Sequence, residues 1–273
     1  MREDIPPRSY GTLIETSAQV VTWNVWGRYG PWAEREAAIV ATLRDAGPDI
    51  VVLTESWATA DDSQCARLAG PLGLPHHAFS GVTAEEDAAA LSGVGILSRW
   101  PIRARAGLTF GEARAQYAEV AGPRGPIQVY GLVMDAWWFD QSQARQDAVR
   151  GLLAHVDQHQ DPRVPLVVAG DFNADPDSDE IRMVTGRTAA PAPGLSFYDA
   201  WEVAGTGPGH TWSNTNHWAT QLLWPDRRID YIFAAAPRPG GAGHPRQAAL
   251  LGTEPTGSVQ PSDHYAVRAS LRY

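Results

Sequence analysis

The segment from Pro165 to Asn173 constrains this chain more than any other part of its sequence. It reads Pro-Leu-Val-Val-Ala-Gly-Asp-Phe-Asn, a short β-branched run that is bounded by Pro165 and Gly170. Such a run predicts a buried strand that ends where Asp171 and Asn173 follow. Residues i and i+2 of a strand face the same side, so we expect both polar side chains to point into one cleft. Alone, the motif is also compatible with a turn closed by an Asx hydrogen bond.

A carboxylate and a carboxamide at the end of an apolar strand suit hydrolytic chemistry. A charged Asp is costly in that position unless a metal, a water molecule or a hydrogen bond satisfies it. In such a pair, the Asp171 carboxylate would handle water and the Asn173 amide would hold an oxygen of the substrate.

Other apolar runs predict a layered α/β or α+β domain with sheets at its centre. Strands are expected over residues 20–23, 50–53, 94–97, 127–133, 166–169, 229–233 and 266–271. One amphipathic helix carries Ile39 and Leu43 and stops at Gly47. A second runs through 144–156 with Ser142 as its cap, and a third follows 177–178 with Ile181 as its apolar anchor.

Length and composition indicate one large domain. The 273 residues are 44% hydrophobic, with neither a fixed-period repeat nor a second zone of composition. We expect an N-terminal arm over residues 1–18 and a single domain over 19–273. The one cysteine, Cys65, excludes an intrachain disulfide framework and a Cys-based zinc site, and it lies in a stretch that predicts a polar helix.

The charged residues exclude several classes of function. All 22 basic residues are Arg and the acidic residues number 31, giving a net charge of −9. The absence of Lys excludes Schiff-base and P-loop lysines, and the negative charge disfavours nonspecific binding to duplex DNA. Since no apolar stretch approaches the roughly 20 residues that span a bilayer, we expect no transmembrane segment. The N-terminus lacks the apolar centre of a signal peptide, so we expect a cytoplasmic protein.

Four more apolar runs end in, or contain, a polar residue. They present Asn24, Glu55, Asp230 and the pair Asp263-His264. Each residue has an ordinary structural role open to it. Asn24 and Glu55 could cap turns, Asp230 could pair with a neighbouring arginine, and His264 could be a hydrogen-bonded core histidine. Five such run ends in one chain, however, favour a shared site.

From about residue 19 to 273, the chain resembles the endonuclease/exonuclease/phosphatase superfamily, which has the deoxyribonuclease-I-like fold. That superfamily includes abasic-site endonucleases, neutral sphingomyelinases and inositol-polyphosphate phosphatases. The resemblance is carried in order by Thr22-Trp-Asn24, Pro48-Asp-Ile-Val-Val-Leu-Thr-Glu55, Gly95-Ile-Leu-Ser-Arg99-Trp-Pro-Ile102, Gly170-Asp-Phe-Asn173, Arg228-Ile-Asp-Tyr231 and Ser262-Asp-His264. It implies a four-layer sandwich of two mixed β-sheets packed face to face, with helices outside and the site at one end.

The resemblance also implies a metal site. Glu55 would be the best ligand, because a hard carboxylate oxygen suits Mg²⁺, with Mn²⁺ as the alternative ion. Asn24 would support that site, and Asp263 would be a second ligand to the metal or to its water network.

The remaining residues of the signature would act on the phosphate ester. Asp171 would orient and deprotonate the attacking water, and Asn173 would hold a phosphoryl oxygen. His264 would contact the phosphoryl group, and Asp230 would fix the tautomer of His264.

One position departs from the superfamily pattern. Many members carry Thr-His-Leu after the central strand, and that His contacts the phosphate, but Val133 stands at the matching position here. Tyr130 or Asp135 could substitute for it. The loss is consistent with an altered substrate, a lower rate or a different chemistry on the same scaffold.

Tryptophan is the second informative feature, since most of the 11 Trp residues lie beside the motifs. Core packing is one role open to them. Amphipathic rings on loops over the site would favour flat or apolar ligands. The candidate substrate-binding residues are Trp137, Trp138, Trp212 and Asn216.

We therefore expect a Mg²⁺-dependent hydrolase of a phosphate ester, with a phosphodiester of a small or amphiphilic substrate favoured. A DNA endonuclease or exonuclease of the abasic-site type is the alternative, which makes nucleic acid a possible but not a favoured partner. A catalytically idle binding protein on the same fold is a third hypothesis, against which the intact carboxylate set argues.

Overall fold

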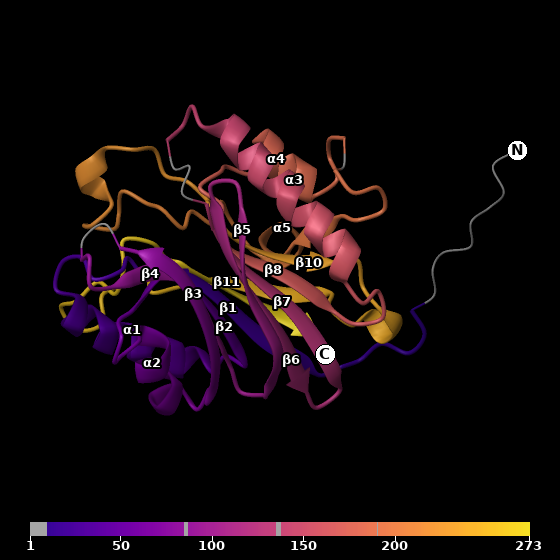
Figure 1. The fold of residues 1–273 in the computed structure, drawn as a ribbon, viewed down its shortest axis with the longest axis horizontal. Helices are drawn as coiled ribbons and strands as arrows, with labels where there is room; N and C mark the ends of the chain where they lie inside the picture. The colour runs from indigo at the N-terminus through magenta and orange to yellow at the C-terminus, as the bar shows by residue number, and fades with distance from the viewer. Residues whose placement is uncertain (1–9, 85–86, 135–137, 190) are drawn as a thin grey trace, which may run out of the picture.

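Two six-stranded sheets pack face to face in this chain (Figure 1). The computed structural model describes residues 10–84, 87–134, 138–189 and 191–273. The strands of the first sheet are β1 (Ser17–Asn24), β2 (Ile50–Ala58), β3 (His76–Thr83), β4 (Leu91–Ser98), β11 (Pro245–Leu251) and β12 (Ala266–Arg272). The strands of the second sheet are β5 (Ile102–Phe110), β6 (Ala113–Gly122), β7 (Gly125–Met134), β8 (Leu166–Asp171), β9 (Phe197–Asp199) and β10 (Asp230–Ala235).

Both sheets are mixed. Their strand orders are β11-β12-β1-β2-β4-β3 and β5-β6-β7-β8-β10-β9. Strand β1 pairs in parallel with β2, and β7 pairs in parallel with β8, while the other neighbours are antiparallel. The helical segments are α1 (Trp32–Ala46), α2 (Gln64–Leu72), α3 (Ser142–His159), α4 (Asp179–Val184), α5 (Ala200–Ala204), and the 3₁₀ turns η1 (Thr220–Leu222) and η2 (Pro239–Gly241).

Three clusters of buried apolar side chains hold the layers together. Val52 and Val167 belong to the cluster between the two sheets. The residues that alternate with these two on the same strands face the helices. Val51 packs in the cluster with α1 and α2, and Val168 packs in the cluster with α3 and α4. Because both faces of these strands are buried, they read as continuous apolar runs. The predicted four-layer sandwich is thereby confirmed.

All seven predicted runs lie in or across strands of the structure, namely β1, β2, β4, β7, β8, β10 and β12. The sequence did not predict β3, β5, β6, β9 and β11. Strand β5 illustrates the reason, because it is an edge strand with mostly exposed residues, including Arg103 and Arg105. An edge strand needs no apolar run, and charged residues protect its unpaired backbone.

The predicted helices are confirmed, with one error at a cap. Helix α1 ends before Gly47, whose φ of 58° is the left-handed conformation that glycine favours. Helix α4 follows Ser178 as expected. Ser142, however, does not cap α3: Gln141 is at the cap position, and the Ser142 hydroxyl donates to Glu180 at 2.7 Å. Cys65 is buried in α2, in the predicted polar helix.

No helix in the described part of the chain is both long and apolar enough to cross a membrane. Strand β1 already begins at Ser17, inside the range expected for an N-terminal arm, and residues 1–9 of that arm lie outside the described residues.

One end of the sandwich collects the polar residues singled out from the sequence. Asn24 ends β1, Asp171 ends β8 and Asp230 begins β10. Antiparallel pairing of β8 with β10 places Asp230 opposite Asp171. Since β1 belongs to one sheet and β8 and β10 to the other, the packing of the two sheets sets the relative position of these side chains.

Gly170 provides a test of how tightly this end is built. Its φ is +144°, and a Cβ there would lie 1.8 Å from the carbonyl oxygen of Leu132. We expect Gly170→Ala to lower the free energy of unfolding by about 3 kcal/mol or more, because the overlap is with backbone that cannot move aside. The control Gly194→Ala, at φ +87° with nothing within 4 Å, should cost about 1 kcal/mol. Urea denaturation measures both, and equal losses would contradict the prediction.

Candidate active site

The side-chain amide of Asn24 joins the two sheets at the centre of the site. Its Nδ2 donates to Oε1 of Glu55 and to Oδ2 of Asp171, each at 2.9 Å. Its Oδ1 accepts from the backbone nitrogen of Trp26 at 3.0 Å. Asn24 and Glu55 belong to the first sheet and Asp171 to the second. Three of the predicted site residues are thus brought into direct contact.

Glu55 reaches this position through a β-bulge. The pairing of β2 with β4 shifts register between Leu53 and Ser56, so β2 holds one extra residue there. Glu55 has a φ of 51°, a left-handed conformation that is uncommon for a residue with a side chain. In regular alternation, Glu55 would share the helix-facing side of Val51 and Leu53. The bulge instead directs its carboxylate to Asn24.

Asp171 and Asn173 come together through a turn rather than along a strand. Strand β8 ends at Asp171, and Oδ1 of Asp171 accepts from the backbone nitrogen of Asn173 at 2.9 Å. Asn173 has a φ of 49°, and its Nδ2 donates to the carbonyl of Met134 at 2.8 Å. The i and i+2 geometry of a strand, from which the pair was expected, does not reach Asn173. The structure contains the alternative, an Asx hydrogen bond.

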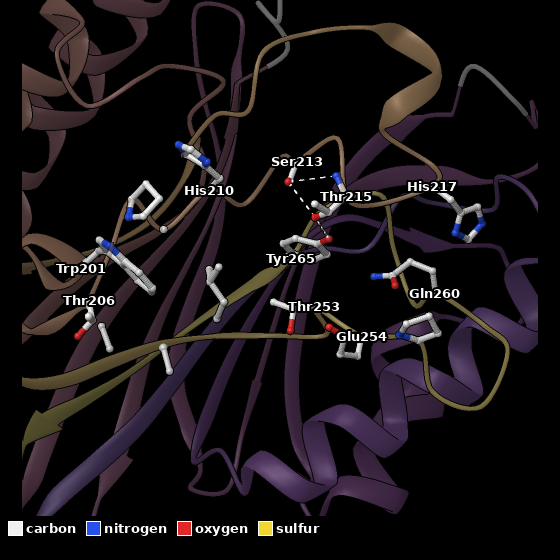
Figure 2. A pocket seen from close by; sticks show the side chains of 16 residues that line it. Trp201, Thr206, His210, Ser213, Thr215, His217, Thr253, Glu254, Gln260 and Tyr265 are labelled. Carbon is white, nitrogen blue, oxygen red and sulfur yellow. Dashed lines mark hydrogen bonds between the residues drawn. The ribbon is translucent and has the colours of Figure 1, made fainter.

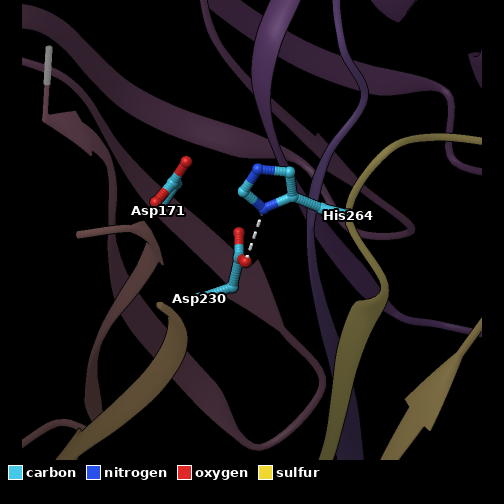
Figure 3. Close-up of side chains that lie close together, drawn as sticks. All are labelled: Asp171, Asp230 and His264. Atoms are coloured by element: carbon cyan, nitrogen blue, oxygen red, sulfur yellow. Dashed lines mark hydrogen bonds and ion pairs between the residues drawn. The ribbon is translucent and has the colours of Figure 1, made fainter. Parts of the chain in front are cut away.

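Asp230 and His264 form a hydrogen-bonded dyad. Nδ1 of His264 donates to Oδ2 of Asp230 at 2.8 Å, and both residues are buried. Figure 3 shows Asp171, Asp230 and His264 converging from β8, β10 and the segment before β12. One oxygen or nitrogen atom of each lies within 4.8 Å of the other two. The dyad leaves Nε2 of the imidazole available to a ligand.

The site buries more negative charge than its neighbours balance. Burial and the Asp263 carboxylate raise the pKa of Glu55 to about 7. Burial and the Asp230 carboxylate raise the pKa of Asp171 to about 7. Burial alone would lower the pKa of His264, but Asp230 raises it well above its ordinary value. The imidazole is therefore held as a cation beside the carboxylates.

The residues around Glu55 fit a divalent cation. Burial raises the pKa of Asp263, and Asp263 in turn disfavours ionisation of Glu55. A cation would relieve this repulsion, and carboxylate oxygens are the ligands that Mg²⁺ prefers. Within the described residues, Oδ1 of Asp230 is also a buried oxygen without a hydrogen-bond partner. Asp171, Asp230 and His264 lie close enough together to be an alternative position for an ion. A cationic imidazole has no nitrogen lone pair for a metal, however, so the Glu55 side is the better position.

Aromatic side chains lie beside these polar groups. The ring of Trp212 lies edge-on to His264, with centroids 5.2 Å apart. Trp224 contacts Trp212 at 5.5 Å and Trp138 at 6.3 Å between centroids. Trp138 is exposed, whereas Trp212 is buried. The predicted Trp137 and Asp135 lie outside the described residues.

Two other predicted residues do not join this group of side chains. Tyr130 is buried under α3, in contact with the rings of Tyr117 and His155, because its side chain alternates to the helix face of β7. Asn216 is also buried, and its Nδ2 donates to the carbonyls of Ser262 and Asp263 at 2.8 and 3.0 Å. Asn216 supports the turn that carries Asp263 instead of facing a substrate.

The sequence matches the model of the Endonuclease/Exonuclease/phosphatase family over residues 21–264. The chain belongs to this family. Truncated TDP2 from Caenorhabditis elegans is similar in structure, with a TM-score of 0.73 and 18% identity over 96% of this chain and 100% of that chain. TDP2 from D. rerio, complexed with single strand DNA product, has a TM-score of 0.73 and 20% identity, covering 95% and 100%.

An endonuclease/exonuclease/phosphatase from Beutenbergia cavernae has a TM-score of 0.69 and 25% identity, covering 94% of this chain and 72% of that chain. Among curated proteins, none matches the sequence. These likenesses agree with the deoxyribonuclease-I-like arrangement of two mixed sheets, which gives the chain the phosphoesterase fold of the family.

In this family member, Val133 occupies an apolar position. It pairs with Asp171 across β7 and β8 and packs in the cluster between the sheets. Beside Asp171 the chain thus has an apolar side chain at the position where the resemblance led us to expect a histidine.

Arg35 is a positioning residue that the sequence did not reveal. Its guanidinium is buried and donates at 2.8–3.2 Å to the carbonyls of Val25, Trp26, Gly27, Tyr29 and Pro261. These bonds tie the loop after Asn24 to the segment before His264. Burial lowers the pKa of Arg35 to about 10, while Asp263 and Glu55 oppose that shift. From the sequence alone, nothing distinguishes Arg35 from an arginine on the exposed face of a helix.

A cavity lies beside the site, lined by the sequence neighbours of Trp212 and His264. It has a volume of about 960 Å³ and lies along β11 and the 206–217 segment (Figure 2). Ser213, Thr215 and Tyr265 line it with linked hydroxyls, at 3.0 and 2.9 Å. Trp212 and His264, their neighbours in sequence, face the active site instead. The residues that line this cavity therefore do not include Glu55, Asp171, Asp230 or His264.

Arg35 offers a test of this positioning role. We expect Arg35→Met to lower the free energy of unfolding by about 3 kcal/mol, because it leaves several buried carbonyls without donors. The control is Arg44→Met, on an exposed position of the same helix, which should change stability by less than about 0.5 kcal/mol. Thermal or urea unfolding measures the difference, and similar stability of the two variants would disprove the role.

Proposed function

We propose that this chain is a Mg²⁺-dependent phosphoesterase that hydrolyses a phosphodiester of a small or amphiphilic alcohol by attack of water. The observation that carries the proposal is the convergence of Glu55, Asp171 and the Asp230–His264 dyad around Asn24. Metal-assisted hydrolysis needs groups of this kind close together: two carboxyl groups with pKa values of about 7, a cationic imidazole and an amide.

Glu55 would hold the ion, with Asp263 as a second ligand to the ion or its waters and Asn24 as the amide that fixes the Glu55 carboxylate. Mn²⁺ is the expected substitute for Mg²⁺. When bound, the ion would supply positive charge for a phosphoryl oxygen. The oxygen donor set and the mutual repulsion of Glu55 and Asp263 support this assignment.

Asp171 would take the proton of the attacking water. A pKa of about 7 suits a general base near neutral pH. The hydrogen bond from Asn24 and the backbone hydrogen bond from Asn173 orient its two oxygens. As the water oxygen bonds to phosphorus, the bond from phosphorus to the leaving alcohol oxygen breaks, and that oxygen departs with the electron pair.

His264 and Asn173 would stabilise the charge that grows on the phosphoryl oxygens. Asp230 holds the His264 imidazole through Nδ1 and keeps it cationic, so Nε2–H would donate to the phosphoryl group. Asn173 uses one amide hydrogen on Met134, which leaves the second for a substrate oxygen.

The surroundings of the cleft favour a small or amphiphilic substrate over duplex DNA. Trp212, Trp224 and Trp138 form a run of aromatic contacts leading outward from His264. Two arginines nearby, Arg28 and Arg227, are each paired with an aspartate. Paired cations contribute little to a phosphate backbone.

A DNA phosphodiesterase is the second candidate. It is favoured by the structural likeness to TDP2 from D. rerio, which was solved with single strand DNA product.

A comparison of substrates separates the two candidates. We expect hydrolysis of bis-nitrophenyl phosphate or of a phospholipid such as sphingomyelin to be faster than that of an abasic oligonucleotide at equal concentration. A chelator should abolish hydrolysis of either kind of substrate. Faster cleavage of the oligonucleotide, weakening steeply with added salt, would favour the DNA candidate.

Single substitutions test the proposed roles. We expect Glu55→Gln and Asp171→Asn each to lower kcat on bis-nitrophenyl phosphate by about 10²-fold or more. Only Glu55→Gln should also weaken Mg²⁺ binding, measured by calorimetry. The control is Glu112→Gln, in an exposed turn, which should keep wild-type rate and metal affinity. Full activity in Glu55→Gln would remove the basis of the proposal.

A further inference from the structure

Two loops beside the cleft expose large apolar side chains. Trp138 and Phe139 are 51% and 46% exposed, and Leu222 and Leu223, at the end of η1, are 51% and 86% exposed. Trp224 joins the two loops, with its ring centroid 6.3 Å from that of Trp138 and 5.4 Å from that of Phe139. We call these five residues the apolar rim. Figure 1 shows the short η1 coil projecting beyond the strands at one end of the sandwich.

The apolar rim differs from scattered surface hydrophobics. Single exposed apolar residues are ordinary on a protein surface, whereas a contiguous group marks a binding surface. Leu223 also has a φ of 57°, a conformation that costs about 1 kcal/mol or more for a residue with a side chain. At 86% exposure, little packing within the chain offsets that cost.

We propose that the apolar rim docks this protein onto the surface of an electrically neutral phospholipid bilayer. Two leucines at a projecting tip can enter the acyl boundary, and tryptophans prefer the level of the headgroups. The inference rests on the proposed function, because it specifies where an amphiphilic phosphate ester would meet the cleft.

The apolar rim is continuous with the candidate active site. Trp224 contacts Trp212 at 5.5 Å between ring centroids, and Trp212 contacts His264 at 5.2 Å. An amphiphile leaving the bilayer would therefore stay on aromatic surface until its phosphate reached His264. A protein partner or a second copy on the same surface would cover the approach to the cleft, so a surface that itself contains the substrate is the better occupant.

The charges of the chain around the apolar rim favour a neutral bilayer over an anionic one. The five residues of the apolar rim are uncharged, and the exposed Asp140 and Asp226 lie next to them in sequence. Two guanidinium groups of the described residues reach the apolar rim, and both are buried and paired. Arg227 lies against Phe139 and pairs with Asp175, and Arg145 donates to the carbonyl of Trp138 and pairs with Glu180. With a net charge of −9, the chain would be repelled by anionic lipids. Neutral headgroups such as phosphatidylcholine are the expected partner.

Flotation with phosphatidylcholine vesicles tests the proposal on the full chain. We expect the wild-type protein to float with the vesicles, equally in 0.1 and ~0.5 M NaCl because no charge attraction is involved. The variant Leu222→Ser/Leu223→Asn should lose at least about tenfold in partitioning, since each buried leucine contributes roughly a tenfold factor. Asn tolerates the left-handed conformation at position 223, so this variant should fold.

The matched control is Tyr198→Ser/Val203→Ser, which removes two exposed apolar residues elsewhere, at 40% and 44% exposure. It should partition within twofold of wild type. Wild-type protein that stays with the aqueous phase, a rim variant that floats like wild type, or binding that requires anionic lipid would each overturn the proposal. So would a wild-type dimer that the rim variant dissociates, since the occupant would then be a second copy.

Hydrolysis of bis-nitrophenyl phosphate without vesicles separates this proposal from the proposed function. The rim variant should keep the wild-type rate on that water-soluble ester, while its vesicle binding falls. If the wild-type protein binds vesicles but hydrolyses nothing, the docking surface stands and the proposed function fails.

Discussion

One amide group holds together two carboxylates that come from opposite sheets. Asn24 donates to Glu55 and Asp171, and no other hydrogen of its side chain remains. The amide compensates the burial of these acids only in part, because the pKa of each stays raised to about 7. Burying charge is costly without a partner. The geometry of the site therefore depends on how the two apolar faces pack, and its stability depends on the cations that balance it.

Two positively charged side chains balance this negative charge, and left-handed backbone at two residues directs the polar groups of the site. Asp230 keeps the imidazole of His264 positively charged. The guanidinium of Arg35 is a second positive charge, and it also donates to the carbonyls of Val25 and Pro261. Glu55 and Asn173 both adopt left-handed backbone, so each points a polar group where a regular strand would not. Such conformations cluster at functional sites because the surrounding structure must hold them in place.

The sequence predicted what hydrophobic burial determines and missed what single contacts determine. Strands with two buried faces, such as β8, appear as apolar runs, and the run ends locate Asp171. The bulge at Glu55 and the turn at Asn173 are one-residue events that leave no periodic signal. The hydrogen bonds of Arg35 go to backbone carbonyls, which every residue has, so no residue type in the sequence points to them. Tyr130 was expected to substitute for the histidine that Val133 stands in place of. It lies three residues before Val133 on β7, so its side chain is on the opposite face of the strand.

The resemblance to the family led us to expect a histidine at position 133, and the valine found there bears on how a substrate would be held. In the cluster between the sheets, Val133 can contribute apolar contact next to Asp171 but no donor to a phosphoryl oxygen. In the proposed mechanism, electrostatic stabilisation would then fall on His264 and the metal site, while recognition of the alcohol would fall on the aromatic surface that begins at Trp212. Apolar contact is not directional, so it discriminates by area rather than by hydrogen-bond pattern. A site built in this way would select for the size and apolar character of the leaving group, which is the property that the proposed bilayer-borne ester would present.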